Sequence, residues 1–128
     1  MKGQTSKGLR ILLLVYAIYM ALYGLGHVLN PGTFGPLDPA TTVLFGLAVL
    51  VFALGALLAY LEKTWDSIRI VVLMQVVWMI LYTIGFVWGL VTGGIPAEPM
   101  VFAPPIIGAI FAILFLIFYF RERKMQGQ

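Results

Sequence analysis

Four uninterrupted apolar stretches decide what this 128-residue chain can fold into. None of them contains Asp, Glu, Lys or Arg, and they cover Ile11–Leu29, Thr41–Leu61, Ile70–Val91 and Pro104–Phe120. At a rise of 1.5 Å per residue, about 17–25 residues cross the roughly 30 Å hydrocarbon core of a bilayer. Because lipid offers no partners for backbone N–H and C=O groups, each stretch must be helical. The sequence therefore predicts an all-α fold, an integral membrane four-helix bundle.

Composition agrees with a single transmembrane domain over residues 1–128, with helices at about 10–29, 41–61, 68–91 and 104–120. Charged residues make up 10% of the chain, against roughly 25% in soluble domains. The basic start resembles a signal peptide, but the first apolar run exceeds the usual core of about 7–15 residues, so we expect a retained helix. The chain has no cysteine, which excludes thiol chemistry within it.

The basic residues predict the orientation of the bundle. They precede the first helix, flank the turn between the second and third, and follow the fourth: Lys2, Lys7, Arg10, Lys63, Arg69, Arg121, Arg123 and Lys124. The other two connections, residues 30–40 and 92–103, contain none. The positive-inside rule then predicts an antiparallel up-down bundle with both termini cytoplasmic, in the cytoplasmic membrane of a prokaryote. The basic ends indicate contact with membrane lipids, and no nucleic acid is expected as a partner.

Aromatic and polar side chains recur on one face of the first predicted helix. Their intervals of three and four residues place them along one stripe, which consists of Tyr16, Tyr19, Tyr23, His27 and Asn30. The third predicted helix carries a similar stripe of Gln75, Trp78, Tyr82 and Phe86. If the stripes face each other, they line an aromatic groove that suits a flat amphipathic ligand, such as a quinone headgroup, a carotenoid-like lipid or a sterol. The alternative is ordinary core packing, in which Tyr and Trp find hydrogen-bond partners between helices.

The candidate ligand-binding residues are therefore Tyr16, Tyr19, Tyr23, His27, Gln75, Trp78 and Tyr82, with a quinone or lipid as the expected ligand. His27 is the only histidine and lies about 25 Å of helix rise from Arg10, near the outer interface. We expect it to close the groove through a hydrogen bond to a loop carbonyl or to Asp38.

An outer-face site of His27, Asp38 and Glu98 is the alternative use of the histidine. Proton handling by such a site would rest on the ordinary imidazole pKa near 6.5. No metal site is predicted, because one imidazole and two loop carboxylates lack a regular ligand spacing. A third interpretation is that His27 lies at the end of the helix and makes only a structural hydrogen bond.

Missing residue types narrow the function classes. Ion-coupled transporters usually keep a charged group at membrane depth. The small multidrug exporters depend on a glutamate in their first helix, whereas the first apolar stretch here contains no acid. The only serines, Ser6 and Ser67, lie at the predicted inner face, so a Ser–His–acid hydrolase site within the membrane is not expected. No catalytic residue is predicted, and the chain is not expected to be an enzyme.

The segment from Arg10 through "YGLGHVLNPGTFG" into "LFGLAVLVFALGALLAY" resembles the first hairpin of DoxX-like membrane proteins, which are small and have four helices. The resemblance covers the first half, while the second half matches in helix number. It implies a membrane subunit that works beside quinone-linked or redox-stress oxidoreductases, and it assigns no catalytic residue. Without cysteine, any sulfur chemistry would belong to a partner.

These patterns together predict a non-catalytic subunit, or a component that holds a lipid or quinone, in a homo-oligomer or a larger redox-linked membrane complex. The alternatives are a membrane oxidoreductase that uses the outer-face residues, and a small-solute transporter.

Overall fold

The computed structural model describes residues 3–31, 38–95 and 97–127. Its four α-helices are α1 (Lys7–Leu29), α2 (Pro39–Leu61), α3 (Trp65–Thr92) and α4 (Ala103–Met125), and a short 3-10 helix, η1 (Pro99–Phe102), precedes α4. Each α-helix is long and apolar enough to cross a membrane. The described ranges contain no β-strand beyond one isolated bridge, between Gln4 and Thr64. The predicted all-α fold with four membrane-spanning helices is confirmed.

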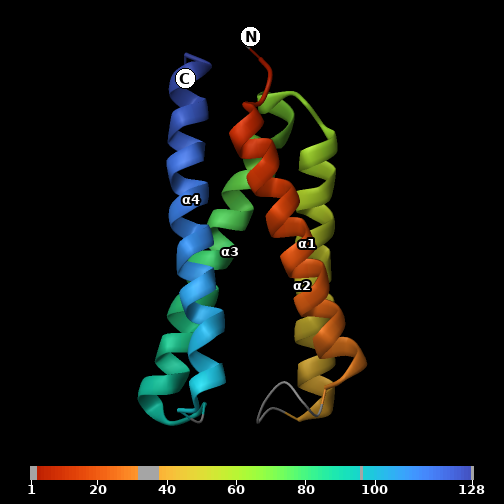
Figure 1. Cartoon of the computed structure of the whole chain (residues 1–128), viewed down its shortest axis with the longest axis vertical. Helices are drawn as coiled ribbons and strands as arrows, with labels where there is room; N and C mark the ends of the chain where they lie inside the picture. Colours follow the sequence, from red (N-terminus) through yellow and green to blue (C-terminus); the bar gives the residue numbers. More distant parts are fainter. Residues whose placement is uncertain (1–2, 32–37, 96, 128) are drawn as a thin grey trace.

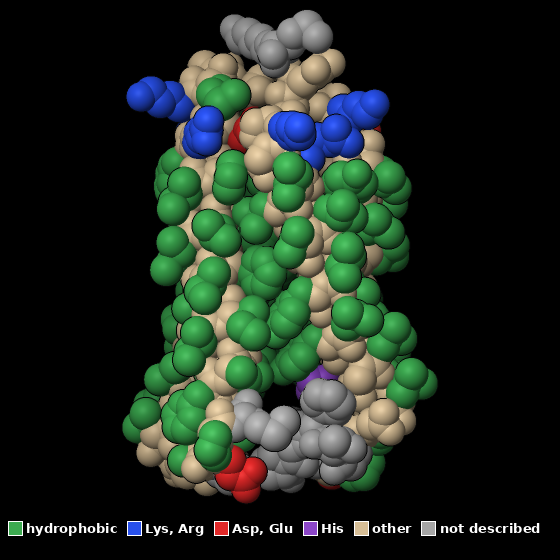
Figure 2. Space-filling model, viewed as in Figure 1, with side chains coloured by type: hydrophobic (Ala, Val, Ile, Leu, Met, Phe, Trp, Pro, Cys, Tyr) green, Lys and Arg blue, Asp and Glu red, His purple; other side chains and the backbone are tan. Residues whose placement is uncertain are grey.

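Two ends of the molecule differ in chemistry. The start of α1, the turn between α2 and α3 and the end of α4 lie together (Figure 1). Lys and Arg side chains gather at this end, whereas acidic side chains occur at both ends (Figure 2). We call the first the basic end and the second the loop end, because the α1–α2 and α3–α4 connections lie there. The Lys and Arg side chains of the described residues are thus gathered at one end of the long axis.

Helix ends extend beyond the apolar stretches because capping groups and helical hydrogen bonds continue into charged sequence. The Ser6 hydroxyl accepts from the Leu9 N–H and starts α1, and the Asp38 carboxylate does the same for α2 through the Thr41 N–H. At the far end of the chain, α4 continues past Phe120 to Met125. Charged residues end a hydrophobic pattern, but they do not end a helix.

The first hairpin, α1 with α2, is held by a direct approach of two backbones. A Cβ on Gly24 would lie 2.9 Å from the Gly46 carbonyl oxygen, and a Cβ on Gly46 would lie 2.8 Å from the Gly24 carbonyl oxygen. In the second hairpin, α3 with α4, a Cβ on Gly108 would lie 2.9 Å from the Thr83 hydroxyl. Small residues let membrane helices pack this closely. Contacts between the two hairpins are far sparser than those within each.

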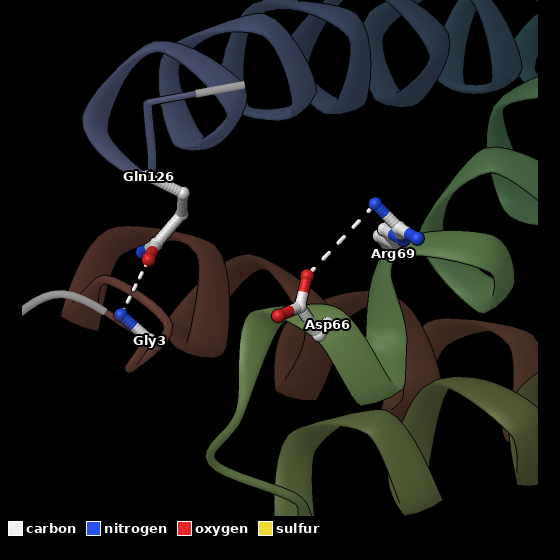
Figure 3. Close-up of polar contacts among 4 residues, drawn as sticks. All are labelled: Gly3, Asp66, Arg69 and Gln126. Atoms are coloured by element: carbon white, nitrogen blue, oxygen red, sulfur yellow. Dashed lines mark hydrogen bonds and ion pairs between the residues drawn. The ribbon is translucent and has the colours of Figure 1, made fainter.

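At the basic end, a group of polar contacts ties the chain before α1 to the rest of the bundle. The Thr5 N–H donates to the Lys63 carbonyl at 2.9 Å, and the Trp65 N–H donates to the Gly3 carbonyl at 2.9 Å. The Gly3 N–H also donates to the Gln126 side-chain carbonyl, so residues from the start of the chain and the end of α4 meet (Figure 3). We call this group the terminal clamp.

A buried acid completes the terminal clamp. Glu122 of α4 is 0% exposed, and its Oε1 accepts from the Ser6 N–H at 3.0 Å. In a capping box, a Glu within the same helix accepts this N–H. Here the acceptor comes from another helix, so the start of α1 depends on α4.

Candidate functional site

The predicted stripes of α1 and α3 meet across the middle of the bundle. The Tyr16 hydroxyl donates to Gln75 Oε1 at 2.6 Å, and Gln75 Nε2 donates to the Phe52 carbonyl at 3.1 Å. Both side chains are fully buried, and each heteroatom of the Gln75 amide has a partner, as buried polar groups require. Within the described residues, no Cα atoms of α1 and α3 approach within 8 Å. Side chains alone therefore bridge these two helices.

A second bridge lies nearer the loop end. The hydroxyl oxygens of Tyr23 and Tyr82 are 2.7 Å apart. Tyr19 stacks on Tyr23 with ring centroids 5.8 Å apart and an interplanar angle of 9°. Trp78 stacks on Phe52 of α2 at 4.5 Å. These rings form a continuous aromatic layer between the hairpins, which includes Phe45 of α2, a residue that the sequence stripes did not indicate.

His27 lies at the loop end of this layer and is 5% exposed. Its Nδ1 lies 2.8 Å from the Tyr23 carbonyl oxygen, one turn earlier in α1. Because a carbonyl only accepts, Nδ1 carries the proton in this hydrogen bond. The ring also packs edge-on against Tyr23 and Phe45, with centroids 4.4 Å and 5.2 Å away. This hydrogen bond lies within α1. The expected contact with a loop carbonyl concerns the α1–α2 connection, of which residues 32–37 lie outside the described residues.

The acids of the predicted outer-face site have other surroundings. The exposed Asp38 caps α2, and its carboxylate accepts from both the N–H and the hydroxyl of Thr41. These hydrogen bonds hold the pKa of Asp38 below its ordinary value. Glu98 is exposed in the connection before η1. Among the described residues, no three His, Cys, Asp or Glu side chains gather in a way that would hold a metal ion. Asp38 and Glu98 are thus both exposed, and Asp38 serves as a helix cap.

A small central cavity lies where the stripes meet. Its lining comes from all four helices and consists of Tyr19, Met20, Tyr23, Val49, Trp78, Met79, Tyr82, Pro104 and Gly108. Its volume is about 10 Å³, roughly what one water needs, whereas drug-sized ligands occupy about 300–1,000 Å³. The lining side chains fill the space of the predicted groove in this conformation. A ring-sized ligand would enter only if the hairpins moved apart.

Two buried polar atoms beside this cavity lack hydrogen-bond partners. They are the indole Nε1 of Trp78 and the hydroxyl of Thr83, which lies against Gly108. Leaving a buried donor unpaired costs about 1–3 kcal/mol. Trp78 also lines the central cavity. An unsatisfied donor and a space therefore occur together at the centre of the aromatic layer.

The hairpins diverge toward the loop end. Their ribbons separate in that direction (Figure 1), and the molecular surface is hollowed between them near that end (Figure 2). At the basic end, by contrast, the terminal clamp holds α1, α3 and α4 together. The aromatic layer therefore lies between the clamped end and the end at which the helix ribbons diverge.

Sequence patterning did not reveal the buried acid Glu122. Its Oε2 has no hydrogen-bond partner, yet it stands within the strongly basic run "RERK". The one available signal was position, since Phe111, Phe115 and Glu122 follow helical spacing on the buried face of α4.

No protein-family profile matches the chain, and neither a curated protein nor a solved structure is detectably similar to it. The class therefore follows from the molecule alone. Four helices of spanning length and apolar surface define a small polytopic membrane protein.

Proposed function

We propose that this protein holds a flat, lipid-soluble molecule with a ring carbonyl, of the quinone type, between its two hairpins, and that it catalyses no reaction itself. The observation that carries the proposal is the buried, unpaired N–H of Trp78 in the lining of the central cavity. A carbonyl oxygen of a bound molecule would accept from it and remove the cost of the orphaned donor.

The tyrosine pair supplies a second donor. When two hydroxyls share one hydrogen bond, the accepting hydroxyl keeps its own proton free for another acceptor. Tyr23 and Tyr82 form such a pair beside Trp78. The flat faces of Tyr19 and Phe45 flank these donors, and aromatic rings stack well on a planar ligand. Two donors among aromatic faces match a ring that bears carbonyl groups.

Access follows from the unequal packing of the bundle. The hairpins diverge toward the loop end (Figure 1), while close backbone contact makes the first hairpin one packed unit. Separation of the hairpins about the terminal clamp would widen the central cavity without breaking either hairpin. His27 stands at the loop end of the layer and acts as the lid residue in this proposal.

Orientation and partners complete the proposal. The gathering of Lys and Arg side chains at one end (Figure 2) favours both termini in the cytoplasm of a prokaryotic cell. The first hairpin's resemblance to DoxX-like proteins favours a place in a redox-linked membrane assembly, as a homo-oligomer or beside a larger enzyme. No contact favours the two alternatives. Asp38 is engaged as a helix cap, and the four apolar stretches contain no Asp, Glu, Lys or Arg that would hold a transported ion at membrane depth.

Binding of a short-chain quinone tests the proposal. The protein, purified in neutral detergent, would be titrated with the quinone, and occupancy would be read by native mass spectrometry. Trp78→Phe keeps an aromatic ring and removes the N–H, so we expect affinity to fall by about tenfold, the effect of a lost hydrogen bond. Trp88→Phe on the same helix is the control, because Trp88 is exposed. No quinone binding to the wild type, or equal losses in both variants, would reject the proposal.

Tyr82→Phe and His27→Gln extend this test. Tyr82→Phe removes one hydroxyl of the pair, so it should weaken binding as Trp78→Phe does. His27→Gln should speed ligand release with a smaller change in affinity, because the side chain closes the site without contacting the carbonyl.

A further inference from the structure

A second hollow lies at the basic end, between α3 and α4. We call it the α3–α4 groove, and it is lined by Arg69, Ile70, Leu73, Tyr119 and Arg123. Its volume is about 390 Å³, within the usual range of ligand sites. It shares no lining residue with the central cavity. We propose that it binds the headgroup phosphate and upper acyl chain of an anionic phospholipid from the leaflet at the basic end.

From its rim inward, the α3–α4 groove changes from charged to apolar side chains, just as a phospholipid changes from a charged headgroup to an apolar acyl chain. Arg69 lies in the second turn of α3, and Arg123 lies in the last turn of α4. Leu73 and Tyr119 each lie one turn further into the bundle, about 6 Å deeper. Cationic groups thus form the rim, and an aliphatic and an aromatic side chain form the floor. A phosphate at the rim would leave the glycerol and acyl chain beside the floor.

The two guanidinium groups are available to a phosphate. Arg69 Nη1 is 3.9 Å from Asp66 Oδ1, in an ion pair whose side chains are 48% and 67% exposed (Figure 3). Such long, exposed pairs contribute little, whereas a guanidinium binds a phosphate through two parallel hydrogen bonds. A bound phosphate would therefore compete successfully with Asp66.

Arg123 is positioned by the ring beneath it. Its guanidinium carbon lies 6.0 Å from the centre of the Tyr119 ring, which is the distance of a cation–π contact. The neighbouring acid, Glu122, does not neutralise it in the groove, because the Glu122 carboxylate is buried and accepts from Ser6. The two charged side chains that line the groove, Arg69 and Arg123, are therefore both cationic.

The floor distinguishes a lipid from a free phosphate ion. Ile70 is 65% exposed and Leu73 is 42% exposed, and an ion at the rim would leave both uncovered. An acyl chain would cover them. Basic pockets between helices near the cytoplasmic face have the right charge and depth for anionic headgroups.

Lipid-dependent thermal stability tests this assignment. The purified protein in neutral detergent would receive phosphatidylglycerol or phosphatidylcholine, and native mass spectrometry would count bound lipids. We expect phosphatidylglycerol to bind and raise the melting temperature, and phosphatidylcholine to do neither. Arg69→Gln and Arg123→Gln should each weaken phosphatidylglycerol binding about fivefold, the effect of one basic residue near an anionic surface. Arg121→Gln is the matched control, since Arg121 is exposed beside the groove residues but does not line the groove.

Each outcome decides the proposal. Selective loss in the Arg69 and Arg123 variants supports it, and retained binding at reduced affinity in Arg69→Lys and Arg123→Lys, which keep the charge, supports it further. An equal loss in Arg121→Gln would show diffuse attraction and overturn it. Competition by inorganic phosphate at equal concentration would overturn the lipid assignment, as would equal binding of phosphatidylcholine. Quinone binding by the Arg69 and Arg123 variants should be unchanged, which separates this test from that of the central cavity.

Discussion

Tyr16 and Gln75 join the two hairpins through one hydrogen bond of 2.6 Å between fully buried side chains. The same Gln75 amide donates to the Phe52 carbonyl, so three helices meet at a single side chain. Gln75 also lies beside Gly55, where an added Cβ would stand 3.4 Å from its Nε2. The absence of a side chain at Gly55 leaves room for the amide between α2 and α3.

Tyr16→Phe should destabilise the bundle by about 1 kcal/mol, because it leaves Gln75 Oε1 buried without a donor. The measurement is thermal or denaturant unfolding in detergent. Gln75→Leu should cost more, since it removes the bonds to both Tyr16 and Phe52. The double variant should be less destabilised than the sum of the single variants, because the two residues share one interaction. Strict additivity would mean that the bond contributes nothing to stability.

Gly46→Ala should destabilise the first hairpin by about 1–3 kcal/mol, the usual cost of overpacking. Its new methyl group would meet the Gly24 carbonyl oxygen and the His27 Cβ, each 2.8 Å away, so backbones must move. Gly85→Ala is the control, because a Cβ there has no atom within 4 Å, and alanine favours a helix over glycine. Unfolding measurements should therefore rank Gly85→Ala at or above the wild type. A tolerated Gly46→Ala would contradict the close approach of the helices.

Asp38 gives the loop end a defined acid sensitivity. Its hydrogen bonds with Thr41 lower its pKa in the folded state below the ordinary value of 3.8. The stabilisation is therefore complete above that value and is lost as the pH falls through the folded-state pKa. Hydrogen exchange of the first turn of α2 should increase over this acid range in the wild type. Asp38→Asn also caps helices but does not titrate, so its exchange should not show this step.

Membrane orientation can be read by cysteine labelling, because the chain has no native cysteine. Ala97→Cys lies at the loop end and Lys63→Cys at the basic end, and both positions are exposed. We expect a membrane-impermeant maleimide to label Ala97→Cys in intact cells and Lys63→Cys only after lysis, following the positive-inside rule. The opposite pattern would reverse the proposed topology and place the α3–α4 groove in the outer leaflet.

Prediction from sequence succeeded where a single property of the sequence determines the structure. The length of the apolar stretches and their lack of charged residues were enough to predict the four helices. Helical spacing placed Tyr16 and Gln75 on stripes that do meet. It left open what pairwise geometry decides, including whether the aromatic rings pack against one another or line a groove. Nothing in the spacing of α1 showed that His27 would bond to the Tyr23 carbonyl, or that the rings would fill their own groove.

Glu122 illustrates the same limit, since a charge within a basic run is ordinarily solvated. Its burial follows from the chain before α1, which folds over it through the Ser6 N–H. Such a contact joins positions 116 residues apart, and no local pattern carries information over that distance.

The link between Ser6 and Glu122 also has a consequence for biogenesis. Ribosomes make α1 first and α4 last, so the N-terminus of α1 lacks its interhelical acceptor throughout synthesis of the intervening helices. The start of α1 is therefore completed only when α4 has been made. A nascent chain that stops before Glu122 would leave the Ser6 N–H to water, and the buried carboxylate that replaces this water arrives only with the end of α4.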